Sequence, residues 1–231
     1  MIQAYEVDAF GTFEKILAVI VTLLALAALG TPKSETVVVN FDVVILTAIS
    51  MLCFAGVILL GFKLRKRSPV EVFGFGRGFL KELLWKIPVG WVVLTLVGLG
   101  AKLALESGGS GEEARMIFEG GGGMEGPLKM FVGVVIIIPV AEEIIFRGLV
   151  YGVAKKAFGF GFGAVASAVV FAIAHNDFTA IPHFIGLSLF AIWLLERTQS
   201  LWPSILLHSL NNLFVFVVMA FQHDGFDFVP K

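Results

Sequence analysis

Residues 141–148 read A-E-E-I-I-F-R-G and place three charged side chains inside an otherwise apolar stretch. The apolar residues 130–140 and 148–154 flank this motif, so Glu142, Glu143 and Arg147 belong to one long hydrophobic segment. An ionised group at membrane depth costs several kcal/mol unless it is paired or faces a wet cavity. These three residues are therefore the first candidates for a functional site.

The composition around this motif indicates an integral membrane protein. The 231 residues are 58% hydrophobic and 15% charged, and the apolar runs approach the length of about 20 residues that a transmembrane helix needs. The net charge of -1 gives no electrostatic signature of nucleic-acid binding. The single cysteine, Cys53, excludes an internal disulfide and a CxxC site.

The hydrophobic pattern predicts an all-α fold, a polytopic transmembrane helix bundle of about seven to eight membrane segments. The predicted segments are residues 13–30, 37–64, 83–104, 127–156, 159–175, 182–196 and 202–221. We expect the basic stretch 63–86 to lie along the membrane surface and the glycine-rich stretch 106–126 to form a flexible loop. One integrated domain results, with N-terminal membrane helices in residues 1–126 and a helix core in residues 127–231.

The basic residues of the short loops predict the orientation in the membrane. The 63–86 stretch, Lys155, Lys156 and Arg197 fall on one side if the segments cross alternately, and the acidic 105–126 loop falls on the other. Lys and Arg favour the cytoplasmic side. We therefore expect the N-terminus and the basic loops to be cytoplasmic and Lys231 to lie on the opposite side.

Within the fourth segment the three charges differ in helical phase. Glu143 and Arg147 are four residues apart with the acid first, the favourable order for an ion pair on one helix face. Glu142 is rotated by about 100° from Glu143 and is left for another task. The alternative is that Glu143 and Arg147 are only a buried pair that fixes helix packing.

Two later segments carry polar residues in apolar surroundings. His175 ends F-A-I-A-H at 171–175, and His208 and Asn212 are four residues apart in H-S-L-N-N at 208–212. Glu142 and His175 lie at similar heights above their shared loop, whereas His208 reaches that depth only if the 155–161 hairpin protrudes or the helices tilt. A single histidine in a membrane helix often only hydrogen-bonds across a bundle. We expect His183 and His223, which lie near segment ends, to have a structural role.

Taken together, these residue types favour hydrolysis. A glutamate in a low-dielectric site is a good general base, and a neutral histidine can share a water molecule with it. A second histidine and an asparagine can donate hydrogen bonds to a developing oxyanion. Since no serine or cysteine is placed as a nucleophile, attack by an activated water on an amide is the natural reaction class.

The three motifs resemble those of the CPBP family of intramembrane proteases, which includes type II CAAX prenyl endopeptidases, abortive-infection proteins and bacteriocin self-immunity proteins. E-E-I-I-F-R-G at 142–148 is similar to its E-E-x-x-x-R motif, F-A-I-A-H at 171–175 to its F-x-x-x-H motif, and H-S-L-N-N at 208–212 to its H-x-x-x-N motif. The approach to the third motif, residues 197–208, is also similar. The resemblance covers about residues 127–221.

The resemblance implies an intramembrane endopeptidase with a conical cavity, acting on membrane-associated peptides or proteins, including prenylated CAAX-type substrates. It implies that Glu142 and His175 activate water and that His208 and Asn212 form the oxyanion site. Glu143 and Arg147 would orient the cluster or position the substrate. We expect no metal or other cofactor, although two histidines and a glutamate would superficially suit zinc.

Two other functions are compatible with the same sequence. A non-catalytic membrane scaffold or immunity protein would use this fold to bind a partner. An ion-coupled transporter would use the buried carboxylates as proton sites.

Overall fold

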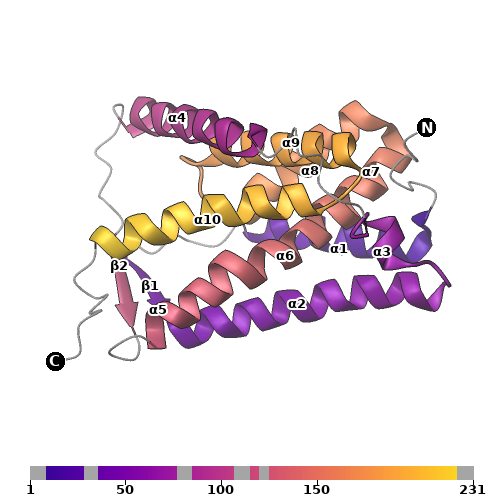
Figure 1. The fold of residues 1–231 in the computed structure, drawn as a ribbon, viewed down its shortest axis with the longest axis horizontal. Coiled ribbons are helices and arrows are strands. Elements are labelled where there is room, and N and C mark those ends of the chain that lie inside the picture. The colour runs from indigo at the N-terminus through magenta and orange to yellow at the C-terminus, as the bar shows by residue number, and fades with distance from the viewer. Residues whose placement is uncertain (1–8, 29–35, 77–84, 107–114, 120–124, 223–231) are drawn as a thin grey trace.

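The computed structural model describes residues 9–28, 36–76, 85–106, 115–119 and 125–222 (Figure 1). His223, Lys231 and most of the glycine-rich stretch lie outside these residues. The helices are α1 (Thr12–Ala28), α2 (Phe41–Leu64), α3 (Pro69–Val72), α4 (Lys86–Glu106), α5 (Glu125–Met130), α6 (Ile138–Glu142), α7 (Tyr151–Phe158), α8 (Phe160–Ala174), α9 (Ile181–Thr198) and α10 (Trp202–Gln222), with π-helices η3 (Phe131–Ile137) and η4 (Glu143–Val150). The strands are β1 (Thr36–Asn40) and β2 (Arg115–Glu119).

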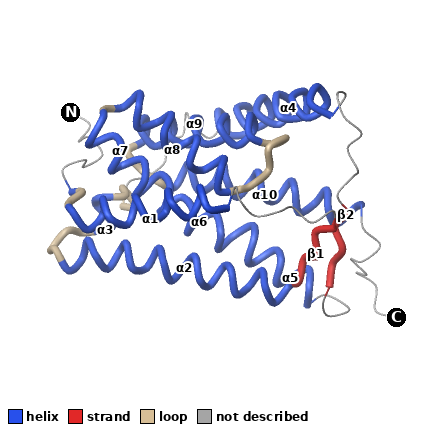
Figure 2. Tube along the Cα trace, turned by 180° about the vertical axis from the view of Figure 1, so that it is seen from behind, coloured by secondary structure: helices blue, strands red, loops and turns tan. Residues whose placement is uncertain are grey.

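The predicted all-α bundle is confirmed, with two short strands added to it. Every one of the seven predicted segments coincides with a helix or, for residues 127–156, with the continuous helical stretch from α5 to α7. In Figure 1, α2 and α4 lie along opposite edges, and α6 and α10 lie between them; Figure 2 shows the same arrangement from behind. The stretch from α5 to α6 runs obliquely to α10, so the helices of the core are inclined to one another.

The outer helix surfaces are apolar, as in a membrane protein. Within the described residues, α2 is the one helix with the length and apolarity to cross a membrane, and shorter apolar helices cover Lys86–Gly100, Phe160–Ala174 and Trp202–Val218. Large apolar side chains point outward from α2, among them Leu46, Ile49 and Leu60. Exposed apolar surface of this extent normally marks a membrane or protein interface.

The start of α2 differs from the sequence prediction. We expected a helix from residue 37, but Val37, Val38 and Val39 lie in β1, which pairs in parallel with β2. β-Branched residues favour strands. Asn40 then starts the helix, because its Oδ1 accepts hydrogen bonds from the backbone N–H groups of Asp42 and Val43.

β2 also lies within the stretch that we predicted to be a flexible loop. The prediction was wrong for residues 115–119, where Met116, Ile117 and Phe118 form a strand opposite the three valines of β1. Glycines on both sides of this short apolar run favour a loop, whereas its Ile and Phe residues favour a strand. The rest of the glycine-rich stretch between α4 and α5 lies outside the described residues.

The stretch after α2 packs into the bundle rather than only along a membrane surface. Phe73 is fully buried and meets Phe62 edge to face at 5.3 Å between ring centroids. Its backbone oxygen accepts a hydrogen bond from Leu201 N, and Trp202 Nε1 donates to Phe75 O at 3.1 Å. The segment therefore fastens the end of α2 to the start of α10; residues 77–84 of the predicted surface segment lie outside the described residues.

The helix that carries the charged motif is interrupted by two π-helical stretches. In η3 the hydrogen bonds reach five residues back, and Ile138 N–H donates to Gly133 O. Pro139 follows directly; it has no N–H, and its ring crowds the carbonyl of the residue four positions earlier. π-Helical turns are rare in proteins, and those that occur are often found at functional sites. Here one lies before Glu142 and the other after it.

Phenylalanine rings seat directly on glycines where helices approach closely. A Cβ atom on Gly148 would lie 2.8 Å from the Phe73 ring, and one on Gly152 would overlap the Phe10 ring. Real Cβ atoms essentially never approach so near. These two glycines therefore set how closely the stretch 143–158 lies to the N-terminal third of the chain.

Candidate active site

Five of the six predicted site residues converge in the structure. Glu142 ends α6, Glu143 and Arg147 lie on η4, His175 follows α8, and His208 lies on α10. Glu143 and Arg147 are fully buried, Glu142 is 7% exposed and His208 is 2% exposed. The inclination of the helices lets His208 reach the depth of Glu142, which resolves the question that sequence spacing left open.

Glu142 faces both histidines without a direct hydrogen bond to either. Its Oε2 lies 3.5 Å from His208 Nε2 and 3.9 Å from His175 Nε2. This oxygen is buried and has no hydrogen-bond partner within the described part of the chain. A water molecule that lies beside this pair, off the line between the two atoms, can be within hydrogen-bond distance of both Glu142 Oε2 and His175 Nε2.

The tautomer of His175 follows from its backbone contact. Its Nδ1 lies 2.8 Å from the backbone oxygen of Phe171, and a carbonyl oxygen can only accept, so Nδ1 carries the proton. In the neutral ring Nε2 is then an acceptor. A water between His175 and Glu142 would donate one hydrogen to each, which leaves its oxygen lone pairs free for attack.

His208 is held by the second carboxylate. Its Nδ1 lies 2.9 Å from Glu143 Oε1, and the same oxygen lies 2.9 Å from an Arg147 nitrogen. The predicted pair of Glu143 and Arg147 is present. Glu143 also orients His208, because it binds Nδ1 of the ring and so turns Nε2 toward Glu142. With Nδ1–H on Glu143, Nε2 can donate to an oxyanion only when the ring carries both protons.

Asn212 is the predicted site residue that the structure does not bring to Glu142. It lies one helical turn after His208 on α10, and its Nδ2 donates to Val134 O at 2.9 Å. Its other hydrogen bond is accepted by Oδ1 from Asn211 Nδ2 at 3.3 Å. Neither hydrogen bond reaches the carboxylate or the two histidines.

Two phenylalanines pack the site and received no role from the sequence. The Phe171 ring lies 4.5 Å from the His175 ring and 5.6 Å from the His208 ring, and the Arg147 guanidinium lies 4.1 Å from its centroid. The Phe184 ring covers the other side of His175, 4.1 Å away. Phe171 could have been identified from the sequence, because it is the first residue of the second motif. Nothing in the sequence distinguishes Phe184 from the other apolar residues of its segment.

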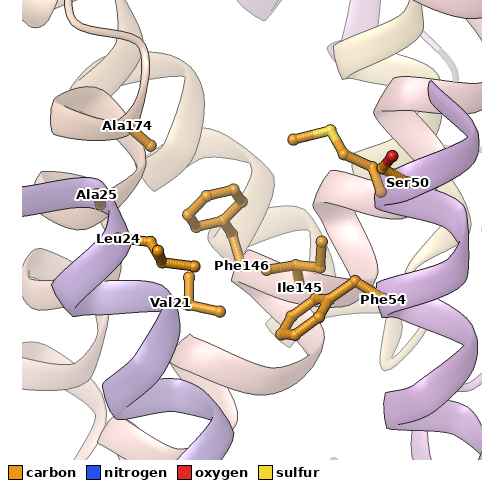
Figure 3. A pocket seen from close by; sticks show the side chains of 9 residues that line it. Val21, Leu24, Ala25, Ser50, Phe54, Ile145, Phe146 and Ala174 are labelled. Atoms are coloured by element: carbon orange, nitrogen blue, oxygen red, sulfur yellow. The ribbon is translucent and has the colours of Figure 1, made fainter. Parts of the chain in front are cut away.

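An apolar cavity of about 350 Å³ lies beside the site. Figure 3 shows Val21, Leu24 and Ala25 of α1 on one side and Ser50 and Phe54 of α2 on the other, with Ile145 and Phe146 between them. This cavity lies mainly between α1, α2 and η4, and the conical cavity that the resemblance implies stays a prediction. Phe146 separates it from the site by meeting Phe171 edge to face at 5.1 Å.

Zinc binding was the alternative that the residue types suggested. Among the described residues, no group of three or more His, Cys, Asp or Glu side chains is arranged to hold a metal ion. The described side chains thus do not fit a zinc site, and the expectation of a metal-free mechanism stays a prediction.

Comparison with known proteins agrees with the motifs. The family model of the Rce1-like type II CAAX prenyl endopeptidases matches residues 124–214, which include all six predicted site residues. The resemblance to the CPBP family is confirmed. The match covers the helical core and indicates a membrane protein, whereas it does not extend to residues 1–123.

Three curated bacterial relatives are similar over part of their length. "Putative membrane peptidase YdiL" of Bacillus subtilis is 26% identical over 59% of this chain and 56% of its own. "Membrane-embedded CAAX protease MroQ" of Staphylococcus aureus is 35% identical over 39% of each chain. "UPF0177 protein YxdF" of Lactococcus lactis is 33% identical over 34% of this chain and 44% of its own.

The chain thus spans about half the length of the curated relatives it matches. No solved structure is similar to it at a significant level.

Proposed function

We propose that this chain is an intramembrane endopeptidase in which Glu142 activates water for attack on a peptide bond. The observation that carries the proposal is the gap around Glu142 Oε2, which lies 3.9 Å from His175 Nε2 and 3.5 Å from His208 Nε2 in a buried setting. The names of YdiL and MroQ, a membrane peptidase and a CAAX protease, support the same class.

In the proposed reaction, water bound between Glu142 and His175 attacks the scissile carbonyl carbon, and its proton passes to Glu142. The carbonyl π electrons move to oxygen. We assign two donors on α10 to the resulting oxyanion: Nε2–H of a doubly protonated His208, and the amide hydrogen of Asn212 that Val134 O does not accept. The intermediate then collapses with cleavage of the C–N bond. Glu142 returns its proton to the leaving amine, which balances the reaction as addition of one water.

Glu143 and Arg147 support this reaction indirectly. Glu143 holds His208 by Nδ1, which points Nε2 toward the reaction centre. Arg147 neutralises Glu143 and stacks on Phe171, which in turn contacts both histidine rings. A site preorganised in this way costs little reorganisation in the transition state.

The substrate class that we propose is a membrane-associated peptide or protein tail that carries an apolar chain, such as a prenyl group. The apolar cavity between α1 and α2 lies next to the site and could take that chain, while the peptide bond lies at Glu142. Lining groups are almost entirely hydrocarbon, with Ser50 as the polar exception, so a charged or strongly polar ligand would be poorly solvated there.

The test uses the full chain purified in detergent and reconstituted in liposomes, with quenched fluorescent peptides that either carry a prenylated CAAX terminus or lack the lipid. We expect cleavage by the wild type and a loss of at least about 10³-fold in kcat for Glu142→Gln, since general base and proton donor are both removed. Glu71→Gln, an exposed carboxylate on α3, is the matched control and should retain activity. Turnover that survives Glu142→Ala would overturn the mechanism.

The same variants and the same liposomes distinguish peptide hydrolysis from the two other functions. A scaffold or immunity protein would keep its cellular phenotype in Glu142→Ala and His175→Ala. A transporter would show proton-linked uptake in the liposomes without proteolysis. Metal dependence is tested by treating the active protein with a chelator, and full activity is the expected result.

A further inference from the structure

A chain of hydrogen bonds runs from α4 through α9 and α10 to η3 and includes Asn212. At one end His183 Nδ1 lies 3.3 Å from Leu94 O, and His183 Nε2 lies 2.9 Å from Asn211 Oδ1. Asn211 Nδ2 donates to Asn212 Oδ1 at 3.3 Å. At the other end Asn212 Nδ2 donates to Val134 O at 2.9 Å.

The backbone carbonyl at the η3 end fixes the direction of every bond in this chain. Val134 O can only accept, so Asn212 must present its NH2 group there and turn Oδ1 toward Asn211. Asn211 then donates its own NH2 group and turns Oδ1 toward His183. His183 must donate through Nε2–H to Asn211 Oδ1. Leu94 O can also only accept, so the contact of Nδ1 with α4 is a hydrogen bond when the ring carries both protons.

This direction matters for the proposed reaction because an amide side chain has two opposite faces. The NH2 group of Asn212 has a second hydrogen, which can stabilise an oxyanion, whereas a flipped amide would present Oδ1 and repel it. A flip would also set two carbonyl oxygens, Asn212 Oδ1 and Val134 O, against each other. The contacts of Asn211 and His183 oppose that flip.

We propose that His183 and Asn211 are positioning residues that hold the Asn212 amide in its donor orientation. The inference rests on the proposed hydrolysis and adds two residues to which the three motifs assign no role. Asn211 is 6% exposed, and His183 is packed so closely on α4 that a Cβ atom on Gly98 would lie 2.8 Å from its Nδ1. His183 is thus held on the α4 side and reaches Asn212 only through Asn211.

The kinetic test compares His183→Ala, His183→Gln and Asn212→Ala in the full chain. We expect His183→Ala to lower kcat by about 10-fold or more with little change in KM, because the oxyanion exists only beyond the ground state. His183→Gln should recover most of the loss, since its amide nitrogen can donate to Asn211. Folded His183→Ala protein with wild-type kcat would overturn the inference.

A double-mutant cycle separates positioning from general packing. If His183 acts through Asn212, His183→Ala should have almost no further effect on kcat in the Asn212→Ala background. If the two losses multiply, the inference is wrong.

A second pair of variants moves His183 without removing it. Gly98→Ala should displace the ring and lower kcat in the same direction, whereas Gly100→Ala, two residues further along α4 and facing open space, should leave kcat unchanged. Equal activity of these two variants would contradict the role of the α4 contact.

A spectroscopic readout keeps this test independent of catalysis. The chain has four asparagines, at positions 40, 176, 211 and 212, so selective ¹⁵N labelling gives few side-chain amide signals. His183→Ala should shift the amide signal of Asn212, which it does not touch, and leave that of Asn40 in place. A shift in a protein without peptidase activity would refute the proposed function but retain the hydrogen-bond chain; no shift in an active enzyme would refute the positioning role.

Discussion

At the scale of single residues, Arg147 is the most costly side chain of the site to place. It is fully buried, 2.9 Å from Glu143 and stacked on Phe171 at 4.1 Å. Two desolvated charges repay their burial only while both are present. The pair therefore favours a defined geometry more than it favours overall stability.

Arg147→Met should destabilise the protein by about 3–5 kcal/mol, because it leaves the Glu143 carboxylate buried without its guanidinium. The free energy of unfolding in mixed detergent micelles measures the loss. Lys129→Met removes a cation from exposed pairs with Asp42 and Glu125 and should cost far less. Adding Glu143→Leu to Arg147→Met should recover part of the lost stability. If Arg147→Met and Lys129→Met lowered the free energy of unfolding equally, this interpretation would be wrong.

The charged residues of the site could be predicted from the sequence because a charge in an apolar segment needs a partner or a task. Glu142, Glu143, Arg147, His175 and His208 were found in this way. The bond between Glu143 and His208 was not, since helical phase tells which face a residue occupies but not which ring nitrogen it meets. Phe184 and His183 were missed or set aside because their contacts come from packing between helices distant in sequence.

At the scale of elements, the long interrupted helix from α5 to α7 determines where the two glutamates point. Hydrophobicity predicted its extent, and the structure confirms it within two residues at each end. Its π-helical stretches could not be predicted from apolar periodicity, which carries no record of whether a carbonyl bonds four or five residues ahead. Pro139 was the local signal, because it removes one donor from the ladder.

Pro139→Ala should restore a donor and let residues 131–142 form a regular α-helix, which would turn both glutamates relative to His175 and His208. We expect kcat to fall by about 10- to 100-fold, since small misplacements of reacting groups are costly, while thermal stability stays equal or rises. Pro182→Ala, in the first turn of α9 where no intrahelical donor is lost, is the control. Unchanged kcat in Pro139→Ala would show that the π-helical phase is dispensable.

At the scale of the whole molecule, the site lies within the family-like core, and the apolar cavity lies between that core and the N-terminal helices. The core residues 124–214 supply all six predicted site residues, and α1 and α2 supply most of the wall of the apolar cavity. The N-terminal helices matched nothing beyond membrane segments in the sequence, so their contribution to a pocket was not predictable. The division at residue 126 and the membrane orientation stay predictions.

Filling the cavity tests the contribution of the N-terminal helices to substrate choice. Ala25→Phe should raise KM for a prenylated peptide by about 10-fold, equivalent to about 1.4 kcal/mol, and leave cleavage of the unlipidated peptide nearly unchanged. Leu23→Phe, on the exposed face of α1, is the matched control. An equal change for both peptides would show that the cavity does not receive the lipid.

Glycine substitutions should divide into two groups across the molecule. Gly56→Ala in α2 and Gly100→Ala in α4 meet nothing within 4 Å and should stabilise the protein by about 0.5–1 kcal/mol each through lower entropy of the unfolded chain. Gly148→Ala and Gly152→Ala should destabilise it, because Phe73 and Phe10 occupy the space of the new methyl group. Thermal unfolding in one detergent compares all four; a stabilised Gly152→Ala would contradict the close seat.

The seating of Phe10 and Phe73 on glycines has a practical consequence for anyone preparing this protein for crystallisation. Alanine scanning for thermostability usually treats helical glycines as safe improvements, yet here the tight ones couple the motif helix to the N-terminal third of the chain. Engineering should therefore begin with Gly56 in α2 and Gly100 in α4, which meet nothing within 4 Å, and should leave Gly98, which packs against His183, unchanged. Replacing Gly148 would disturb the helix that carries Glu142, Glu143 and Arg147, the residues whose geometry a crystal structure should establish.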